Sequence, residues 1–503
     1  MRDCTARLNF NIHIRGVDGR FTPLIFVQGS CAVCFDPWLG DQIPPNERMY
    51  FMTETIAAIA TPDGTGGMAV IRISGEGAIA RADAIFQPVR GKRPSEMAGY
   101  TCAYGHILRD GQRLDDVVLT VFRAPHSYTG EDVVEISCHG GRYLTEQILR
   151  TVLCDSVRLA GAGEFTKRAF LNGKLSLTQA EAVADLISAS GEHALKAARS
   201  LREGATFKRI SAFSETLLVL LSDLAVWADY PDEDIPDVDG GALETRLTAL
   251  LSDMSLLLST YDYGRILREG LHTAIVGKPN VGKSTLFNAL SGYDRSIVTD
   301  IAGTTRDSID ELIRVGGVTL RLTDTAGIRE TEDVIERIGV ERSWQNLENA
   351  DLILAVFDTS RLLDDEDRAL LARLPMERTI CICNKSDLPS FWNPSVLGFA
   401  EFIEISAKTG DKLPALEDAV AHFCKRWNFS PEDGMIANER QRSCLISAID
   451  AVQEGLDALH MGLAYDAVTV SLDGAADALL QLIGERVTDR VVDTVFERFC
   501  VGK

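Results

Sequence analysis

The sequence lacks long apolar runs, a surplus of basic residues and regularly spaced cysteines. No apolar run approaches the roughly 18 residues that a membrane-spanning helix needs, so none is predicted. Lys and Arg number 51 against 73 Asp and Glu, giving a formal net charge of −22, which disfavours a general basic coat for nucleic acid. The 11 cysteines are irregularly spaced and indicate no disulfide framework.

The N-terminal stretch carries no basic region followed by an apolar core and a small-residue cleavage site. This absence predicts no secretory signal peptide and favours a cytoplasmic protein. Residues 1–51 are irregular in Pro, Gly and Cys, and a regular strand pattern begins only at Met52. We interpret residues 1–51 as an extension that is either disordered or the product of a misplaced start. Cys31 and Cys34 have no second pair at zinc spacing, so no structural metal is predicted.

After residue 51, the pattern of hydrophobic residues changes at a few clear points along the chain. The full chain of 503 residues is 46% hydrophobic and 25% charged, a globular composition with length for about three domains. Short β-rich runs in 52–171 predict an α+β domain, whereas 172–270 and 429–503 show helical periodicity. Residues 271–428 alternate buried strands with helices, which predicts an α/β domain. Its position between two helical stretches predicts an insertion into one helical domain.

The α/β region opens with a phosphate-binding motif. Residues 277–284 read GKPNVGKS between an apolar strand and a helix, matching G-x-x-x-x-G-K-[ST]. The glycines let backbone N–H groups turn toward phosphates, Lys283 reaches the β and γ phosphates, and the Ser284 hydroxyl can ligate Mg²⁺. The predicted nucleotide-binding residues of this loop are Gly277, Asn280, Val281, Gly282, Lys283, Ser284 and Thr285.

Three companion motifs follow in order, each where a predicted strand ends. DTAG supplies a carboxylate for Mg²⁺ and a glycine amide facing the γ phosphate. In NKSD, the Asp387 carboxylate can accept both N1–H and the 2-amino group of guanine, a donor pair that adenine lacks. SAK completes a base-binding loop, and the set predicts a guanine nucleotide site. Its members are Asp324, Thr325, Ala326, Gly327, Asn384, Lys385, Asp387, Ser406, Ala407 and Lys408.

The loop IVTDIAGTTRD, before DTAG, is either a polar solvated loop or a nucleotide-dependent switch in which Thr305 ligates Mg²⁺. Ile328 stands where Ras-like enzymes carry the glutamine that orients water, so another group must position it. Asn280 and loop carbonyls offer oxygen ligands for a monovalent cation near the phosphates. On the residues alone, Glu336 is interpreted as a solvated helix-face glutamate. The switch residues are Thr299, Asp300, Ile301, Ala302, Gly303, Thr304 and Thr305.

From about Thr53 to Lys503 the chain resembles the MnmE (TrmE) family of tRNA modification GTPases. Many GTPases share the nucleotide motifs, but this family combines them with the run GEFTKRAFLNGKL and a Cys-x-Gly-Lys end. Cys138 before His-Gly-Gly and Val501 before Gly502 depart from the usual family residues. The segments that carry the resemblance are TIAAIATPDGTGGMAVIRISG, SYTGEDVVEISCHGG, GEFTKRAFLNGKLSLTQAEAVADLI, GKPNVGKSTLFNAL, IVTDIAGTTRD, DTAGIRETEDVIERIGVERSW and FCVGK.

The resemblance implies a multidomain α/β and α+β protein. A folate-binding, dimer-forming α+β domain would precede a helical domain that carries an inserted Ras-like P-loop GTPase domain. The homodimer would hydrolyse GTP in a potassium-dependent way, and hydrolysis would drive domain rearrangement. With a flavin-dependent MnmG (GidA)-type partner, in a heterotetramer, such proteins add a carboxymethylaminomethyl group to carbon 5 of the wobble uridine of certain tRNAs.

The resemblance also implies roles for single residues. Ser284 and Thr305 match magnesium ligands, and Glu336 matches the glutamate that activates water, which reverses its interpretation as a solvated residue. Cys500 matches a cysteine linked to the modification chemistry, although a free cysteine is more often a small hydrophobe. The potassium ligands are Asn280, Thr299, Ile301 and Thr304. The positions for 5-formyltetrahydrofolate or a related folate are Arg72, Glu135, Lys174 and Lys503.

Two other functions share these motifs. A GTPase switch in ribosome assembly would carry the same nucleotide site, together with a basic RNA-binding domain that this sequence does not show. Alternatively, the N-terminal domain is a folate-dependent one-carbon transferase and the GTPase domain regulates it.

Overall fold

The computed structural model describes most of the chain as two compact units. One unit comprises residues 1–127 and 131–160, and the other comprises residues 128–130 and 161–503. Near the N-terminus, β1 (Ile12–His13) and β2 (Leu24–Ile25) pair antiparallel. Apart from these two strands, the described residues are 54–229, 239–293, 311–322, 350–399, 402–425, 431–497, 499 and 501–502.

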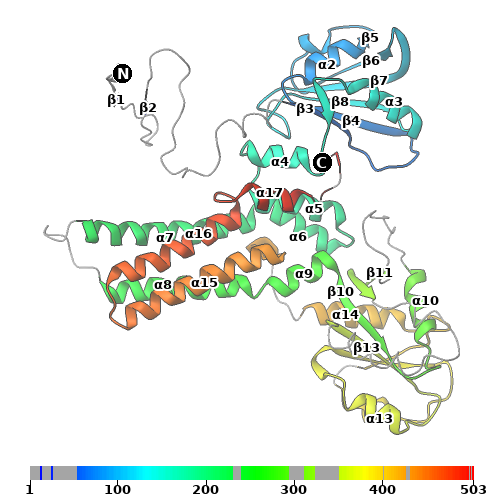
Figure 1. The fold of residues 1–503 in the computed structure, drawn as a ribbon. Coiled ribbons are helices and arrows are strands. Elements are labelled where there is room, and N and C mark those ends of the chain that lie inside the picture. Colours follow the sequence, from blue (N-terminus) through cyan, green and yellow to red (C-terminus); the bar gives the residue numbers. More distant parts are fainter. Residues whose placement is uncertain are drawn as a thin grey trace, which may run out of the picture. The chain divides into compact units, whose positions relative to one another are not determined.

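The first unit is built on a seven-stranded sheet of order β5-β6-β7-β8-β4-β3-β9, in which only β3 and β9 pair in parallel. The helices α2 and α3 lie against this sheet (Figure 1), and their apolar residues share one core with one face of the sheet. The strands are β3 (Thr55–Ile59), β4 (Met68–Ser74), β5 (Phe86–Pro88), β6 (Thr101–Arg109), β7 (Gln112–Phe122), β8 (Val133–His139) and β9 (Val157–Leu159). The helices are α2 (Ala78–Ile85) and α3 (Arg142–Val152), with a 3₁₀ turn at Pro94–Glu96.

Alternation along the strands decides which side chains enter this core. In β8, Val134, Ile136 and Cys138 are buried against the helices. Glu135 lies between two of them and therefore points to the opposite face, because successive strand residues alternate sides. The short β-rich runs predicted within 52–171 are confirmed, and GMAVIRIS, DDVVLTVF and EDVVEISC among them form β4, β7 and β8.

Most helices of the second unit come from two distant parts of the sequence. Ser176 caps α5, since its Oγ accepts from Gln179 N at 3.3 Å while Gln179 Oε1 accepts from Ser176 N at 2.9 Å. The first set is α4 (Glu164–Leu171), α5 (Leu177–Ser188), α6 (Glu192–Arg202), α7 (Ala205–Asp229), α8 (Gly240–Leu258) and α9 (Tyr261–Glu269). The second set is α15 (Glu439–His460), α16 (Tyr465–Ile483) and α17 (Asp489–Phe496).

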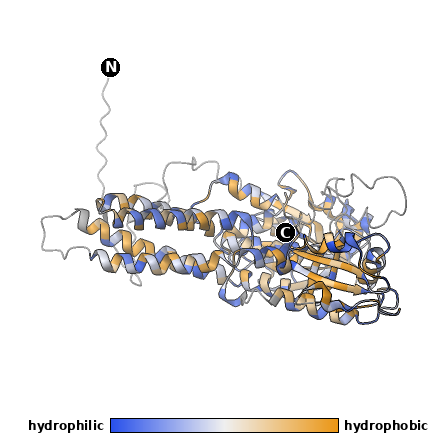
Figure 2. Ribbon diagram, turned by 90° about the horizontal axis from the view of Figure 1, so that it is seen from below, coloured by the Kyte–Doolittle hydropathy of each residue, from blue (hydrophilic) through white to orange (hydrophobic). Residues whose placement is uncertain are grey.

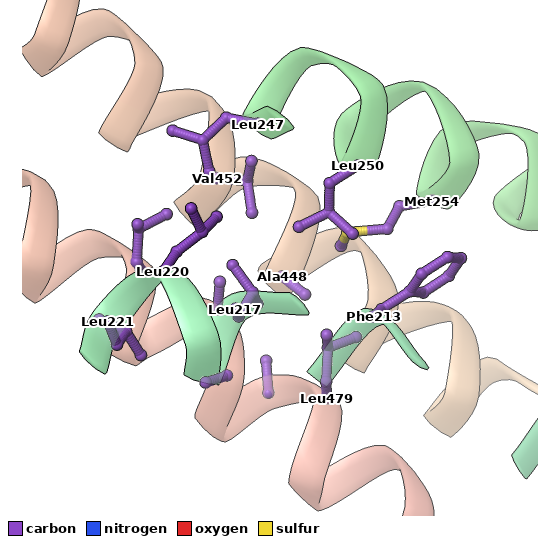
Figure 3. Packing of buried hydrophobic residues seen from close by; sticks show 14 of the residues in the cluster. Phe213, Leu217, Leu220, Leu221, Leu247, Leu250, Met254, Ala448, Val452 and Leu479 are labelled. Carbon is purple, nitrogen blue, oxygen red and sulfur yellow. The ribbon is translucent and has the colours of Figure 1, made fainter. Parts of the chain in front are cut away.

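Four of these helices form one apolar core (Figure 3). Leu217 of α7, Leu247 of α8, Val452 of α15 and Leu479 of α16 are each 0% exposed. Full burial of such a side chain contributes about 1.5–3 kcal/mol. The helical stretches before and after the α/β region therefore share a single core, as the predicted insertion requires.

The α/β region forms a six-stranded sheet of order β11-β12-β10-β13-β14-β15. All neighbours are parallel except the hairpin of β11 and β12. The strands are β10 (Leu271–Val276), β11 (Glu311–Val315), β12 (Val318–Leu322), β13 (Leu352–Asp358), β14 (Thr379–Asn384) and β15 (Phe402–Glu404). The helices are α10 (Lys283–Tyr293), α13 (Asp365–Leu371) and α14 (Leu413–Lys425), with 3₁₀ turns at Met376–Arg378, Pro394–Leu397 and Pro431–Asp433.

Every residue of β13 is buried, as expected for a central strand of a parallel sheet covered on both faces. The alternation of buried strands and helices predicted for residues 271–428 is confirmed, with β10, β12, β13, β14 and β15 among the strands. Hydrophilic and hydrophobic residues alternate along the long helices of the second unit (Figure 2). None of the described helices combines the length and the apolar character that a bilayer crossing demands.

Candidate nucleotide-binding site

A cavity lies where three parallel strands of the six-stranded sheet end. β10 leads into the GKPNVGKS loop, β14 ends at Asn384, and the SAK loop follows β15. Because the carboxyl ends of parallel strands meet at one edge, these loops converge. The cavity has a volume of about 300 Å³ and is lined by Gly282, Thr285, Asn384, Lys385, Asp387, Leu388 and Lys408. All of these except Leu388 were predicted from the motifs.

The two glycines of the phosphate loop occupy positions that no other residue fits. A Cβ on Gly277 would lie 2.4 Å from the Val356 carbonyl oxygen, and its φ is +149°. A Cβ on Gly282 would lie 2.2 Å from Asn384 Nδ2, at a φ of +100°. The loop therefore passes against β13 and β14 without room for a side chain, which explains the two glycines of the motif.

Lys283 begins α10 and bends back over the loop that precedes it. Its Nζ donates to the carbonyl oxygens of Gly277 at 2.7 Å and Lys278 at 2.8 Å. Burial lowers the pKa of this ammonium group. Because both contacts are neutral carbonyls, they do not neutralise the charge, and a phosphate beside the N-terminus of α10 would do so.

Asn384 joins the phosphate loop to the SAK loop. Its Nδ2 donates to the Val281 carbonyl oxygen at 2.8 Å, and its Oδ1 accepts from Ala407 N at 2.9 Å. The side chain is only 3% exposed, so both ends of a buried amide are satisfied. This asparagine therefore fixes the spacing between the loop predicted to hold phosphate and the loop predicted to hold the base.

Asp387 is exposed at the mouth of the cavity and held from below. Its Oδ1 accepts from Ser406 Oγ at 2.7 Å, and Ser406 is fully buried. Thr409 N in turn donates to the same Ser406 hydroxyl at 3.3 Å. Ser406 of the SAK motif thus orients the Asp387 carboxylate of the NKSD motif.

An ion pair that the motifs do not predict holds the phosphate loop from outside. Lys278 Nζ contacts the carboxylates of Asp364 and Glu366, the latter at 2.9 Å, at the start of α13. The hydrogen bonds from Lys278 hold the pKa of Asp364 at about 2. Nearby, Asn280 has a φ of +64°, a conformation that asparagine adopts more readily than most residues.

Several predicted site residues lie outside the described part of the chain, and their placement stays a prediction. They belong to the switch loop, the DTAG motif, the helix beyond it and the C-terminus. They are Thr299, Asp300, Ile301, Ala302, Gly303, Thr304, Thr305, Asp324, Thr325, Ala326, Gly327, Glu336, Cys500 and Lys503.

Two of the predicted folate residues are paired on the first unit's sheet. Arg72 of β4 and Glu135 of β8 are register partners. Arg72 Nε and Nη2 lie 2.8 and 2.7 Å from Glu135 Oε1, and the two side chains are 19% and 26% exposed. Lys174 belongs to the other unit, in the turn between α4 and α5. Within the first unit, the structure therefore pairs Arg72 with Glu135.

A phosphate loop and a loop suited to guanine, which meet at one cavity where parallel strands end, define a P-loop GTPase. Family comparison extends this class over the rest of the chain. A model described as the MnmE helical domain matches residues 177–500, and one described as the GTP-binding protein TrmE N-terminus matches residues 55–174. The chain belongs to the MnmE family of tRNA modification GTPases.

Curated relatives match along nearly the same length. The tRNA modification GTPase MnmE of Clostridioides difficile (strain 630) is 42% identical over 458 residues, covering 90% of this chain and 100% of that protein. The MnmE of Geobacillus kaustophilus (strain HTA426) is 42% identical over 462 residues, again 90% and 100%. Among solved structures, the G domain of the T. maritima FeoB iron transporter covers 30% of this chain and 96% of its own, with 25% identity and a TM-score of 0.22.

Proposed function

We propose that this GTPase supports modification of the wobble uridine of certain tRNAs in the cytoplasm, working as a homodimer with an MnmG (GidA)-type flavoprotein in a heterotetramer. The group added would be carboxymethylaminomethyl at carbon 5. The observation that carries the nucleotide part is the cavity in which Asn384 ties the phosphate loop to the base loop while Ser406 orients Asp387. Family membership supports the tRNA part.

The described residues suit GTP in distinct roles. Lys283 and the N–H groups that open α10 would hold the β and γ phosphates, and the two carboxylate oxygens of Asp387 would accept N1–H and the 2-amino group of guanine. Ser284, exposed in the first turn of α10, would hold Mg²⁺ together with Thr305. Bound there, Mg²⁺ neutralises phosphate charge. Glu336 would orient the attacking water.

Potassium dependence is a separate part of the proposal. Asn280 is exposed in the phosphate loop beside the cavity, where its side-chain oxygen can serve a monovalent cation with Thr299, Ile301 and Thr304. We expect faster GTP hydrolysis in KCl than in NaCl at equal ionic strength, and Asn280→Ala should remove the difference. Equal rates in the two salts for the unaltered protein would contradict this part.

The proposed folate site uses charges that the first unit already orders. Arg72 contacts Glu135 through Oε1, so Oε2 would accept an N–H donor of a pterin-like ring, and Lys174 and Lys503 would attract the carboxylates of the glutamate tail. Calorimetric titration with 5-formyltetrahydrofolate should show binding that Glu135→Gln weakens. Unchanged binding in that variant would remove Glu135 from the site.

The net charge of −22 bears on how tRNA is held. An acidic protein repels the phosphate backbone over most of its surface, so the contact must be local or supplied by the flavoprotein partner. Mass spectrometry of wobble nucleosides from strains with and without the gene tests the whole proposal. We expect the C5 substituent to disappear in the deletion strain and to return with the intact gene, but not with the Glu336→Ala variant.

The boundaries of the domains are proposed as well. We propose residues 1–51 as an extension and 52–171 as the folate-binding and dimerisation domain. Residues 172–270 and 429–503 would form the helical domain, and 271–428 the GTPase domain inserted in it.

A further inference from the structure

We propose that Asp358 is a positioning residue for guanine nucleotide binding, which acts by holding Lys385 in the place where it lines the cavity. No sequence motif marks Asp358, and it does not itself line the cavity. The inference rests on the proposed nucleotide site, because it assigns a residue that prepares one wall of that site.

The sheet register brings the two residues together. Asp358 is the last residue of β13 and pairs in register with Asn384, the last residue of β14. Lys385 follows at once, with a φ of +69°, and its Nζ donates to Asp358 Oδ2 at 2.6 Å. The lysine is thus turned back toward the neighbouring strand instead of extending freely into solvent.

The carboxylate that receives this lysine is itself fixed. Asp358 Oδ1 accepts from Ser360 N at 2.9 Å and from Ser360 Oγ at 2.6 Å, so each oxygen has its own donor. The Trp392 indole N–H also donates to the Asp358 carbonyl oxygen at 3.2 Å. At 7% exposure, this side chain has little room to change rotamer.

Hydrogen bonding keeps Asp358 ionised. Burial alone would raise the pKa of its carboxyl group, but the hydrogen bonds from Lys385 and Ser360 lower it below its ordinary value. A buried carboxylate in this state requires a nearby cation, and Lys385 supplies it at hydrogen-bond distance.

A second cation lies close but cannot replace the lysine. Arg361 Nε is 3.8 Å from Asp358 Oδ2, and Arg361 Nη2 is 3.9 Å from Asp367 Oδ1. Both nitrogens are buried without a hydrogen-bond partner within the described part of the chain. Of these two cations, only Lys385 therefore makes a directional contact with Asp358, and only Lys385 also lines the cavity.

The physical benefit is preorganisation. A lysine side chain has many rotamers, and immobilising them when a ligand binds reduces affinity. Because Asp358 immobilises Lys385 beforehand, that loss is borne by folding rather than by nucleotide binding. Removing the carboxylate should weaken the nucleotide even though the two do not touch.

A double-mutant cycle on the full chain tests the inference, with fluorescent mant-GDP as the probe. We expect Asp358→Ala to raise the dissociation constant about tenfold, chiefly through a faster off-rate, and Asp358→Asn, which still offers an acceptor oxygen, about threefold. In a Lys385→Met background, Asp358→Ala should change the constant less than twofold. Asp365→Asn, on an exposed aspartate of α13 that pairs only with Arg368 among its described ion pairs, is the matched control.

The outcomes distinguish an error in the proposed nucleotide site from an error in the role proposed for Asp358. If Lys385→Met leaves mant-GDP affinity unchanged, the nucleotide site is misplaced. If Lys385→Met weakens binding but Asp358→Ala does not, or weakens it equally in both backgrounds, Asp358 is not a positioning residue. Circular dichroism of all four proteins checks their folding. If Lys385→Met, which leaves the buried Asp358 carboxylate unpaired, folds poorly, Lys385→Arg replaces it in the cycle, and the same two outcomes decide.

Discussion

The four-helix core and the cavity edge of the six-stranded sheet use buried residues in opposite ways. The core is filled by apolar side chains, mostly leucine, with valine, alanine, isoleucine, methionine and phenylalanine (Figure 3), so its residues contribute to stability and carry no chemistry. At the cavity edge, Asp358, Asn384 and Ser406 are buried polar residues, each engaged in hydrogen bonds. Substitutions in the core should change the free energy of unfolding, and substitutions at the edge should change ligand affinity.

Gly282→Ala should give the largest effect at the cavity edge. The new Cβ would lie 2.2 Å from Asn384 Nδ2 at a φ of +100°, so the link between the two loops must shift. We expect mant-GDP affinity to fall by about 100-fold or more. Gly292→Ala is the control, since a Cβ on this glycine of α10 meets nothing within 4 Å. Equal affinities for the two variants would contradict the packing of the phosphate loop.

Leu479→Ala is the corresponding change in the helical core. Leu479 is 0% exposed, so its removal should lower the free energy of unfolding by about 4 kcal/mol. Urea titration followed by circular dichroism measures this loss, and mant-GDP affinity should stay within twofold. Val470→Ala, on the same helix at 71% exposure, should cost little. A large fall in nucleotide affinity for Leu479→Ala would break the contrast between the two regions.

The ion pair of Asp185 and Arg268 lies among the helices, yet it is polar, so it tests whether the helical region affects stability alone. Asp185 of α5 lies 2.8 Å from Arg268 of α9, and burial raises the pKa of its carboxyl group to about 6 although the arginine lowers it. With a folded-state pKa above the unfolded value, stability falls as the pH rises from about 4 to 6 and is constant above that. The shift corresponds to about 3 kcal/mol.

Urea unfolding of the intact protein and of Asp185→Asn at pH 4, 5, 6 and 7 isolates this effect, since the other carboxyl groups are common to both. The stability of Asp185→Asn relative to the intact protein should rise across this range. Parallel stability curves would show that Asp185 is not shifted by its surroundings.

Ser176→Ala should give the smallest of these effects. It removes the capping hydroxyl of α5 that accepts from Gln179 N, which costs about 1 kcal/mol. The midpoint of urea unfolding should fall slightly, with no change in nucleotide affinity. Ser188→Ala serves as its control at the other end of the helix, where the hydroxyl donates to the Ala184 carbonyl oxygen.

The cavity edge could be predicted from the sequence more fully than the packing of the helical core. The cavity edge is predictable because each of its motifs, GKPNVGKS, NKSD and SAK, is a contiguous stretch of sequence. Each motif follows a strand, and parallel strands end at the same edge of a sheet. The helical periodicity predicts the core helices but not their partners. Glu181 accepts from Arg440 at 2.7 and 2.9 Å and from Gln441 at 2.7 Å, across about half of the chain. No local pattern marks such a pair.

Even around the cavity, some elements and contacts could not be predicted from the sequence. β11 was not predicted, because ELIRV is short and mixes charged with apolar residues. Leu388 lines the cavity, yet nothing in its neighbourhood distinguishes it from an ordinary exposed leucine. The contacts of Asp358 with Lys385 and of Lys278 with Asp364 depend on the register of β13 and β14 and on the position of α13. Tertiary packing fixes these features.

The base preference of Asp387→Asn tests the central claim most directly. If the Asp387 carboxylate accepts the N1–H and 2-amino donors of guanine, an asparagine there can accept only one of them. Its amide N–H then faces the 2-amino group of guanine unfavourably but can donate to the 2-oxo group of xanthine. Equilibrium binding of mant-GDP and mant-XDP to the intact and altered proteins measures this. The account predicts that Asp387→Asn weakens mant-GDP by at least about 100-fold and gains mant-XDP. Unchanged preference for mant-GDP would contradict the assignment of this cavity as the guanine site.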